Sequence, residues 1–115
     1  MNPRASKAKG RRLQNFVRDL LRKAFPKLEE DDIKSQTMGM PGEDIVLSPL
    51  AKVCIPYSFE CKNVEKLNVW SAIKQAEDNC QDREPVVVIK RNRTDAYAVV
   101  KAEHLIKLIG EKHGS

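Results

Sequence analysis

The stretch GEDIVLSPLAKVCIPYSFECKN, from Gly42 to Asn63, alternates apolar and polar residues toward its end. That alternation predicts a strand over Ile55–Lys62, because successive side chains of a strand point to opposite faces. The strand then has an apolar face, with Tyr57, Phe59 and Cys61, and a polar face, with Ser58, Glu60 and Lys62. An acid and a base therefore share one face, close enough for both to reach one ligand atom.

The beginning of the same stretch predicts a partner strand over Glu43–Leu47, after a Pro-Gly turn. Ser48–Pro49 is typical of a helix start, because Ser can cap the first turn and Pro suits the first helical position. One short helical turn is therefore expected between the two strands. If the strands pair antiparallel around this excursion, Asp44 lies beside Glu60.

Helices are predicted on both sides of this stretch. Apolar residues recur at helical spacing over Ser6–Phe25, where Pro26 ends the run, and again over Asn68–Cys80. Asn63 or Asn68 can cap the second helix. A closing helix is predicted from Ala102, Leu105, Ile106 and Ile109.

Three further strands complete the predicted sheet. A short strand is expected in IKSQTM (33–38), and the four consecutive apolar residues of PVVVIK (85–90) predict a central strand that is covered on both faces. AYAVV (96–100) follows after a short polar link, which predicts an antiparallel neighbour. The expected order is α-β-β-β-α-β-β-α, an α/β fold with one mixed central sheet of about five strands flanked by helices.

The composition bounds the class of protein. The 115 residues suit a single domain, 1–115, in which 1–8 and 111–115 are expected to be flexible tails. No apolar run approaches a membrane span of about 20 residues, and the basic start lacks the apolar segment of a secretory signal. Cys54, Cys61 and Cys80 form no CxxC pair, so we expect free and mostly buried thiols in an intracellular, cytoplasmic protein, without a cysteine metal site.

Positive charge is concentrated at the start of the chain. Residues 1–27 hold nine Lys or Arg against one acid, Asp19, and the cluster KRNR follows at 90–93. Such a distribution favours a nucleic-acid partner, although the charges can also simply solvate a helix and a tail. The predicted DNA contacts are Lys7, Lys9, Arg11, Arg12, Asn63, Lys90, Arg91 and Arg93.

The expected proximity of Asp44 and Glu60 favours a cation site. Two converging carboxylates repel each other unless a cation lies between them, and Mg²⁺ prefers oxygen ligands. Lys62 adds a positive charge for a phosphate oxygen or an attacking hydroxide. Together with the basic helix these residues suggest phosphodiester hydrolysis. The alternative is an ordinary half-buried strand with a solvated polar face.

The pattern G-E-D-I followed by F-E-C-K resembles the core of the PD-(D/E)xK nuclease superfamily, which has a restriction-endonuclease-like fold. The resemblance implies that Asp44 and Glu60, with the backbone carbonyl of Cys61, bind Mg²⁺, for which Mn²⁺ substitutes. It also implies that Lys62 assists the nucleophilic water and that Gln75 touches the catalytic site.

The segment KGRRLQNFV (9–17) resembles the first helix of archaeal Holliday junction resolvases, and the whole chain resembles small resolvase-like nucleases of phages. Those resolvases carry a metal-site glutamate where this chain has Gln14, which is neutral and can ligate only through its amide oxygen. Glu43 is the alternative acid, although it can join the site only if the backbone turns there.

The resemblance implies a structure-selective endodeoxyribonuclease that resolves branched DNA or Holliday junctions as a homodimer, since two symmetric cuts need two active sites. The alternatives are a non-catalytic nucleic-acid-binding module of the same fold and a nuclease or nickase acting on duplex DNA. Trp70 is expected to pack on the core or on a second subunit rather than to stack on a base.

Overall fold

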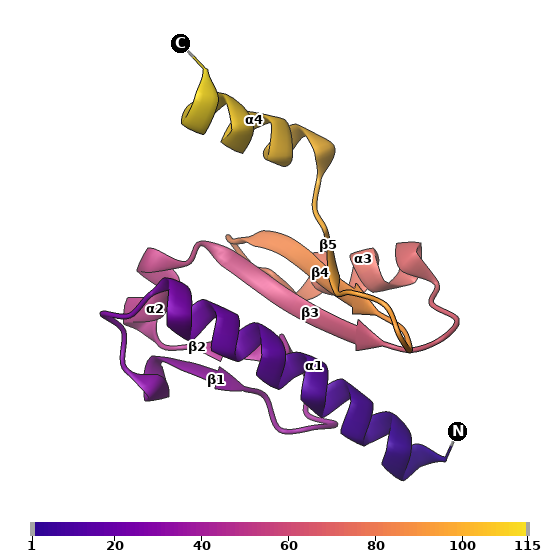
Figure 1. Cartoon of the computed structure of the whole chain (residues 1–115). Helices are drawn as coiled ribbons and strands as arrows, with labels where there is room; N and C mark the ends of the chain where they lie inside the picture. The colour runs from indigo at the N-terminus through magenta and orange to yellow at the C-terminus, as the bar shows by residue number, and fades with distance from the viewer. Residues whose placement is uncertain (1, 115) are drawn as a thin grey trace.

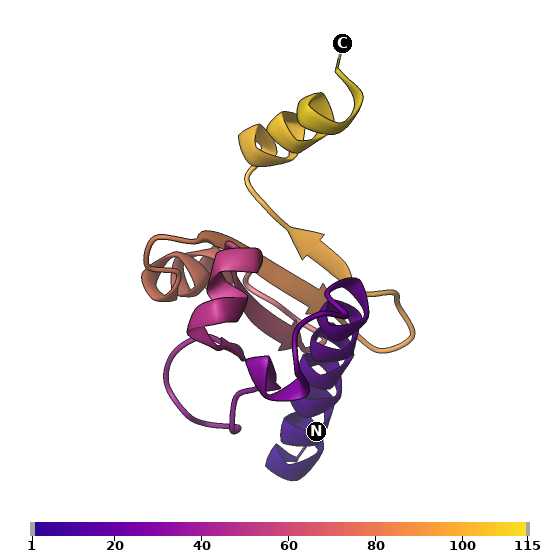
Figure 2. The same ribbon diagram turned by 90° about the vertical axis from the view of Figure 1, so that its left-hand side faces the viewer.

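The computed structural model describes residues 2–114. It is an α/β structure, with helices on both faces of a three-stranded sheet and a separate two-stranded sheet (Figures 1 and 2). In chain order the elements are α1 (Pro3–Ala24), the 3-10 turn η1 (Glu30–Asp32), β1 (Ile33–Ser35), β2 (Ile45–Leu47), α2 (Pro49–Cys54), β3 (Tyr57–Asn63), α3 (Val69–Asn79), β4 (Glu84–Lys90), β5 (Tyr97–Val99) and α4 (Ala102–His113). The predicted order of helices and strands is confirmed.

The expectation of one sheet of five strands is wrong. β1 and β2 form an antiparallel pair, and β3, β4 and β5 form a second sheet. The two sheets touch where the Asp44 amide donates to the Phe59 carbonyl at 3.0 Å. The amide of Cys61, which would continue the ladder, donates instead to the Asp44 carboxylate at 2.7 Å. A side chain therefore replaces the backbone acceptor that a continuous sheet would need.

β4 is the central strand of the three-stranded sheet, as its run of apolar residues predicts. It pairs in parallel with β3 and antiparallel with β5, with Glu60 opposite Val87. Val86, Val87 and Val88 are all buried. Val86 and Val88 pack in the core that includes α1, whereas Val87 packs against α3, so alternate residues of β4 serve the two faces.

α1 extends further toward the N-terminus than the sequence suggested. The side chain of Asn2 accepts a hydrogen bond from the Ala5 amide, and Pro3 occupies the first turn. Residues 3–8, expected to be a flexible tail, are therefore helical, and residue 1 lies outside the described residues. Leu13 and Val17 of α1 bury against the sheet.

α4 projects away from the rest of the molecule in both views (Figures 1 and 2). Its attachment includes a 2.6 Å hydrogen bond between His104 Nε2 and the hydroxyl of Tyr57. The helix continues to His113, through part of the expected tail at 111–115, and residue 115 lies outside the described residues. No residue of α4 is buried. Across residues 2–114, no helix is both long and apolar enough to cross a membrane.

Candidate functional site

The candidate site lies at the free edge of β3, beside the start of β2. The Asp44 amide donates to the carbonyl of Phe59, and one oxygen of its carboxylate accepts from the amide of Cys61. The amide and carbonyl of one strand residue point to the same edge, so the Cys61 carbonyl lies on the edge that Asp44 occupies. The predicted proximity of Asp44 and the Glu60–Lys62 segment is confirmed.

Glu60 is a completely buried carboxyl group. One of its oxygens, Oε1, accepts a hydrogen bond from the side-chain amide of Asn79 at 2.9 Å. Burial and, to a smaller extent, the neighbouring Asp44 raise the pKa of Glu60 to about 7, against the opposing effect of the Asn79 hydrogen bond. Glu60 therefore changes charge near neutral pH.

Asp44 and Lys62 complete the charged part of the site. Burial raises the pKa of Asp44, while the Cys61 amide and, to a smaller extent, the charge of Lys62 oppose that rise. Lys62 is half-buried and lowers the pKa of both carboxyl groups. Two acids and one base thus interact electrostatically at one point, as the spacing predicted.

Two oxygen atoms at the site lack a hydrogen-bond partner among residues 2–114. They are Oε2 of Glu60 and Oε1 of Gln14, and both are buried. Gln14 belongs to α1, and its side chain is near enough to Asp44 to lower the pKa of that acid. A buried acceptor without a donor costs about 1–3 kcal/mol, so a cation or water ligand would stabilise this arrangement.

These oxygens are the right donors for a hard divalent cation. Asp44, Glu60, the amide of Gln14 and the carbonyl of Cys61 all offer oxygen, which is the donor that Mg²⁺ prefers. The residue set is poor in charge, however: no three His, Cys, Asp or Glu side chains within residues 2–114 converge in a metal-binding group. A cation would therefore have two carboxylates, with neutral oxygens as its other protein ligands.

Glu43 is not part of this oxygen set. One carboxylate oxygen, Oε2, accepts from Nη2 of Arg83 at 2.6 Å and from the hydroxyl of Ser58 at 2.7 Å. Arg83 also donates to the carbonyl of Tyr57 at 3.1 Å. Glu43 thus joins the segment before β2 to the beginnings of β3 and β4, and the hypothesis that it completes the metal site is not supported. Neighbouring residues of an extended chain point apart, which explains why Asp44 and Glu43 have different partners.

Gln75 was predicted to touch the site, but it lies exposed on α3. Among residues 2–114 its side chain makes no hydrogen bond to Asp44, Glu60 or Lys62. Asn79, one helical turn later, is the residue of α3 that reaches Glu60. The sequence contains a signal for Asn79, because residues four apart, such as Gln75 and Asn79, lie on the same side of a helix.

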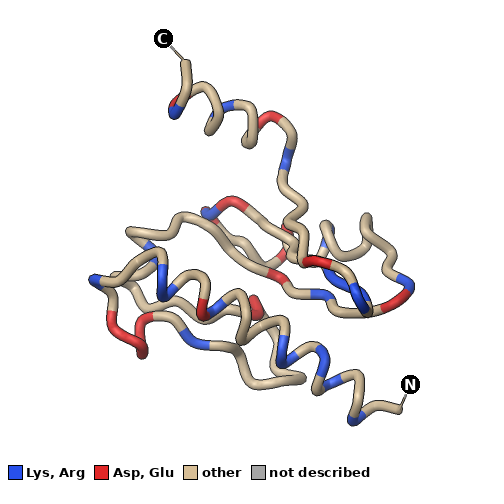
Figure 3. The backbone as a smooth tube through the Cα atoms, viewed as in Figure 1, with Lys and Arg blue, Asp and Glu red and all other residues tan. Residues whose placement is uncertain are grey.

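Exposed basic side chains lie on the N-terminal half of α1 and in the β4–β5 turn. Lys7, Arg11 and Arg12 are exposed on α1, and Arg91 and Arg93 are exposed in the turn. Figure 3 shows Lys and Arg residues along α1. In the N-terminal half of the helix they outnumber the acidic residues. These five remain available for the predicted contact with DNA.

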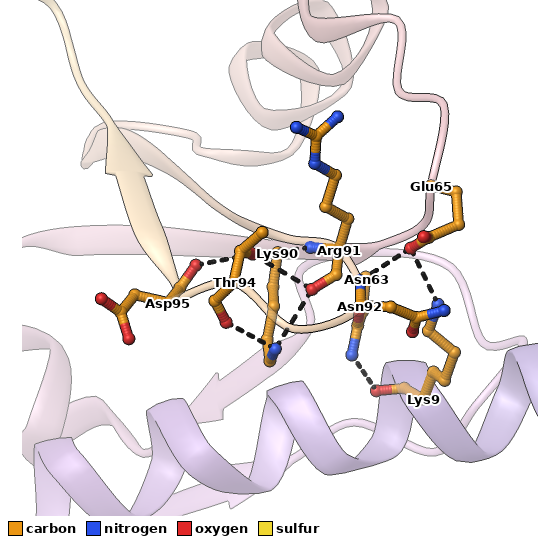
Figure 4. Close-up of polar contacts among 8 residues, drawn as sticks. All are labelled: Lys9, Asn63, Glu65, Lys90, Arg91, Asn92, Thr94 and Asp95. Atoms are coloured by element: carbon orange, nitrogen blue, oxygen red, sulfur yellow. Dashed lines mark hydrogen bonds and ion pairs between the residues drawn. The ribbon is translucent and has the colours of Figure 1, made fainter.

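Three other predicted DNA contacts have partners inside the protein (Figure 4). Lys9 is 5% exposed and pairs with Glu65 at 3.4 Å. Asn63 is buried and donates to the carbonyl of Lys9, which ties β3 to α1. Lys90 donates to the carbonyls of Arg91 and Thr94, so its amine closes the β4–β5 turn. Their role in the fold accounts for their polar groups, and the prediction that they contact DNA is not supported.

The cysteines and the tryptophan differ partly from expectation. Cys61 is buried, and burial raises the pKa of its thiol, with a further contribution from the charges of Asp44 and Glu60. Cys54 is exposed and Cys80 is only partly buried, so the expectation that the three thiols are mostly buried is wrong. Trp70 is 80% exposed, so the expectation that it packs on the core of its own chain is wrong.

Comparison of the chain with protein-family models, with curated proteins and with solved structures found no match. A functional proposal therefore depends on the residues of the site and their geometry.

Proposed function

We propose that this chain is a metal-dependent endodeoxyribonuclease with a restriction-endonuclease-like core, and that it hydrolyses phosphodiester bonds in branched DNA. The observation that carries the proposal is the buried group of Asp44 and Glu60 with Lys62 beside it, in which Glu60 Oε2 and Gln14 Oε1 lack a donor among the described residues. The order of helices and strands around this group supports the same proposal.

The chain's own residues would divide the chemistry among them. Asp44, Glu60 and the carbonyl of Cys61 would hold Mg²⁺, and Gln14 would add a neutral oxygen or hold a water molecule. When bound, the cation would supply Lewis-acid activation of the phosphate and of the attacking water. Lys62 would place a positive charge near the developing negative charge.

The raised pKa of Glu60, to about 7, gives the proposal a pH dependence. A protonated carboxylic acid is a poor cation ligand, so Glu60 would have to lose its proton in order to hold the cation. Cation binding at this site would release a proton near neutral pH and would strengthen as pH rises through the pKa of Glu60. Asn79 would favour the ionised form by donating to Oε1.

Branched DNA is the favoured substrate because the chain offers exposed basic residues but little else with which to read a sequence. Arg11 and Arg12 on α1, with Arg91 and Arg93 in the β4–β5 turn, would contact backbone phosphates. Two symmetric cuts across a junction need two sites, which favours a homodimer.

A second candidate is a DNA-binding module of this fold without catalytic activity. The specific observation in its favour is that Gln14 is neutral and that Glu43 is paired with Arg83, which leaves two carboxylates for a cation. Action on plain duplex DNA, as a nuclease or nickase, is a third outcome of the experiment that follows.

The test is cleavage of a panel of end-labelled four-way junction, flap, duplex and single-stranded DNA, with Mg²⁺, with Mn²⁺ and with chelator. We expect paired symmetric cuts in the junction that require the metal. Glu60→Gln and Lys62→Ala should abolish cleavage and keep binding, while Glu77→Gln, an exposed acid on α3, is the matched control.

Binding to junctions without cleavage under all metal conditions would favour the non-catalytic module. Cuts in every duplex at equal rates would remove the preference for branched DNA. Cleavage that survives Glu60→Gln would contradict the proposed site.

A further inference from the structure

Helix α4 presents an apolar surface that its own chain leaves uncovered. Leu105, Ile106 and Ile109 recur at helical spacing with Ala102 and form one stripe, here called the α4 stripe. The three large side chains are 46%, 65% and 47% exposed. A contiguous stripe of this kind marks an interaction surface more often than a solvated helix face.

An apolar groove lies elsewhere on the same chain, between α1 and strands β4 and β5. Its volume is about 330 Å³, and none of its eleven lining residues is charged. Phe16 and Leu20 of α1 stand at one wall and are about half exposed, and Ala98 of β5 lies on the other side. α1 covers the β3 part of this sheet face through Leu13 and Val17, which leaves the β5 part open. This surface is the α1–β5 groove.

The tether at the start of α4 holds its stripe away from its own body. His104 bonds to Tyr57 at 2.6 Å, and the connection from β5 to α4 is two residues long, Val100 and Lys101. With about 100° of rotation per helical residue, Ile109 and Ile106 lie roughly 140° and 200° around the helix from His104. The stripe therefore faces away from the side of α4 that contacts Tyr57. α4 itself projects from the rest of the chain in Figures 1 and 2.

The stripe and the groove have compatible lengths. From Ala102 to Ile109 the helix rises about 10 Å, and the α1 wall of the groove, from Phe16 to Ala24, rises about 12 Å. Ala98 of β5 and Ala96, just before the strand, leave room for a helix to approach the sheet closely. Each chain thus carries one helix and one groove, and the hydrogen bond between His104 and Tyr57 holds the start of that helix away from the groove of its own chain.

We propose that α4 of one copy docks in the α1–β5 groove of a second copy, and that the exchange is reciprocal. A two-fold axis relates the two contacts, so the assembly closes as a dimer and both apolar surfaces are covered. The basic N-terminal half of α1, with Arg11 and Arg12, lies outside the groove and remains exposed. The dimer concerns association alone and does not depend on the proposed nuclease activity.

The first test is the sedimentation mass of the full chain and of three variants, with circular dichroism as the check on folding. The wild type should sediment at twice 13.1 kDa. Ile106→Glu in the stripe and Leu20→Glu in the groove should each weaken the dimer about tenfold or more, because each places a charge in an apolar contact. Lys107→Gln, on another side of α4, should leave the mass unchanged. All three positions are exposed, so the folded monomer should tolerate the changes.

The second test shows which groove the helix occupies. In a background with Cys54→Ser and Cys80→Ser, one tagged population carries Ile106→Cys and another, with a different tag, carries Leu20→Cys. A short bis-maleimide added to the mixture should link the two tags together. A monomeric wild type would overturn the proposal, and so would a dimer that neither Glu variant weakens. A chain with both cysteines that links only to itself would show that α4 folds onto its own groove, which also overturns it.

Discussion

Replacing Glu60 by Gln should stabilise the metal-free protein above neutral pH. Glu60 is completely buried, and its pKa is raised from an ordinary value of 4.5 to about 7. Gln keeps the shape of the side chain and an oxygen that can accept from Asn79, but it carries no charge. The variant therefore removes a buried ionisation and retains the hydrogen bond.

The magnitude follows from the linkage between protonation and folding. An acid whose pKa is higher in the folded state binds its proton more tightly there, so the protein loses stability as pH rises between the unfolded and folded pKa values. Since one pKa unit corresponds to about 1.36 kcal/mol, ionised Glu60 costs the folded protein on the order of 3 kcal/mol above pH 7. At pH 4 the group is protonated in both states and the cost is absent.

The assay is urea unfolding at a series of pH values between 4 and 8, in the presence of a chelator, for wild type and Glu60→Gln. The two proteins should have similar free energies of unfolding at pH 4, and the variant should be more stable by about 2–3 kcal/mol at pH 8. Glu77→Gln, which changes an exposed acid on α3, should follow the wild type throughout. Adding Mg²⁺ at pH 8 should raise the stability of the wild type more than that of Glu60→Gln.

Parallel pH curves for wild type and Glu60→Gln would refute the reasoning, because they would mean that Glu60 ionises as easily in the folded protein as in the unfolded chain. A variant that is less stable at pH 8 would be equally damaging, since it would assign Glu60 a stabilising charge interaction.

Further perturbations test the other parts of the structure. Asp44→Asn should abolish cleavage of branched DNA while changing its Kd less than about threefold, because the basic surface supplies most of the affinity; a large loss in a gel-shift titration would contradict this. Arg83→Leu should lower the free energy of unfolding by about 3–5 kcal/mol, because it leaves Glu43 without its partner in a largely buried ion pair; a loss below 1 kcal/mol in urea would count against that role. Binding of junction DNA should weaken steeply as salt rises, and Arg11→Gln should reduce the slope of log K against log salt by about one phosphate contact; a flat salt response would exclude α1 as a phosphate-binding surface.

The sequence determined most of the local structure, because local structure depends on the spacing of apolar residues and on capping chemistry. The helix beginning at Pro49 follows from Ser48 and Pro49, and its cap is a hydrogen bond from the Ala51 amide to the Ser48 hydroxyl. The central position of β4 follows from its continuous apolar run. Alternation along β3 alone places Glu60 and Lys62 on one face of the strand.

The sequence left two kinds of contact open: competition between groups for one backbone amide, and ion pairs between residues far apart in the chain. The carboxylate of Asp44 takes the Cys61 amide, and this competition divides the expected sheet in two. Glu43 pairs with Arg83, forty residues later in the chain, and sequence spacing cannot indicate a contact of that separation. The pairing of Lys9 with Glu65 joins residues 56 apart, and sequence spacing cannot indicate it either.

The sequence by itself thus determined the elements, the basic surface and the candidate pair of Asp44 with the Glu60–Lys62 strand, because periodicity and charge are properties of short segments. Only the tertiary structure decided that Asn79 rather than Gln75 supports Glu60, that Glu43 turns to Arg83, and that α4 leaves its own apolar groove uncovered. Those outcomes depend on which groups meet across the fold, where burial and competition for hydrogen bonds select one partner among several.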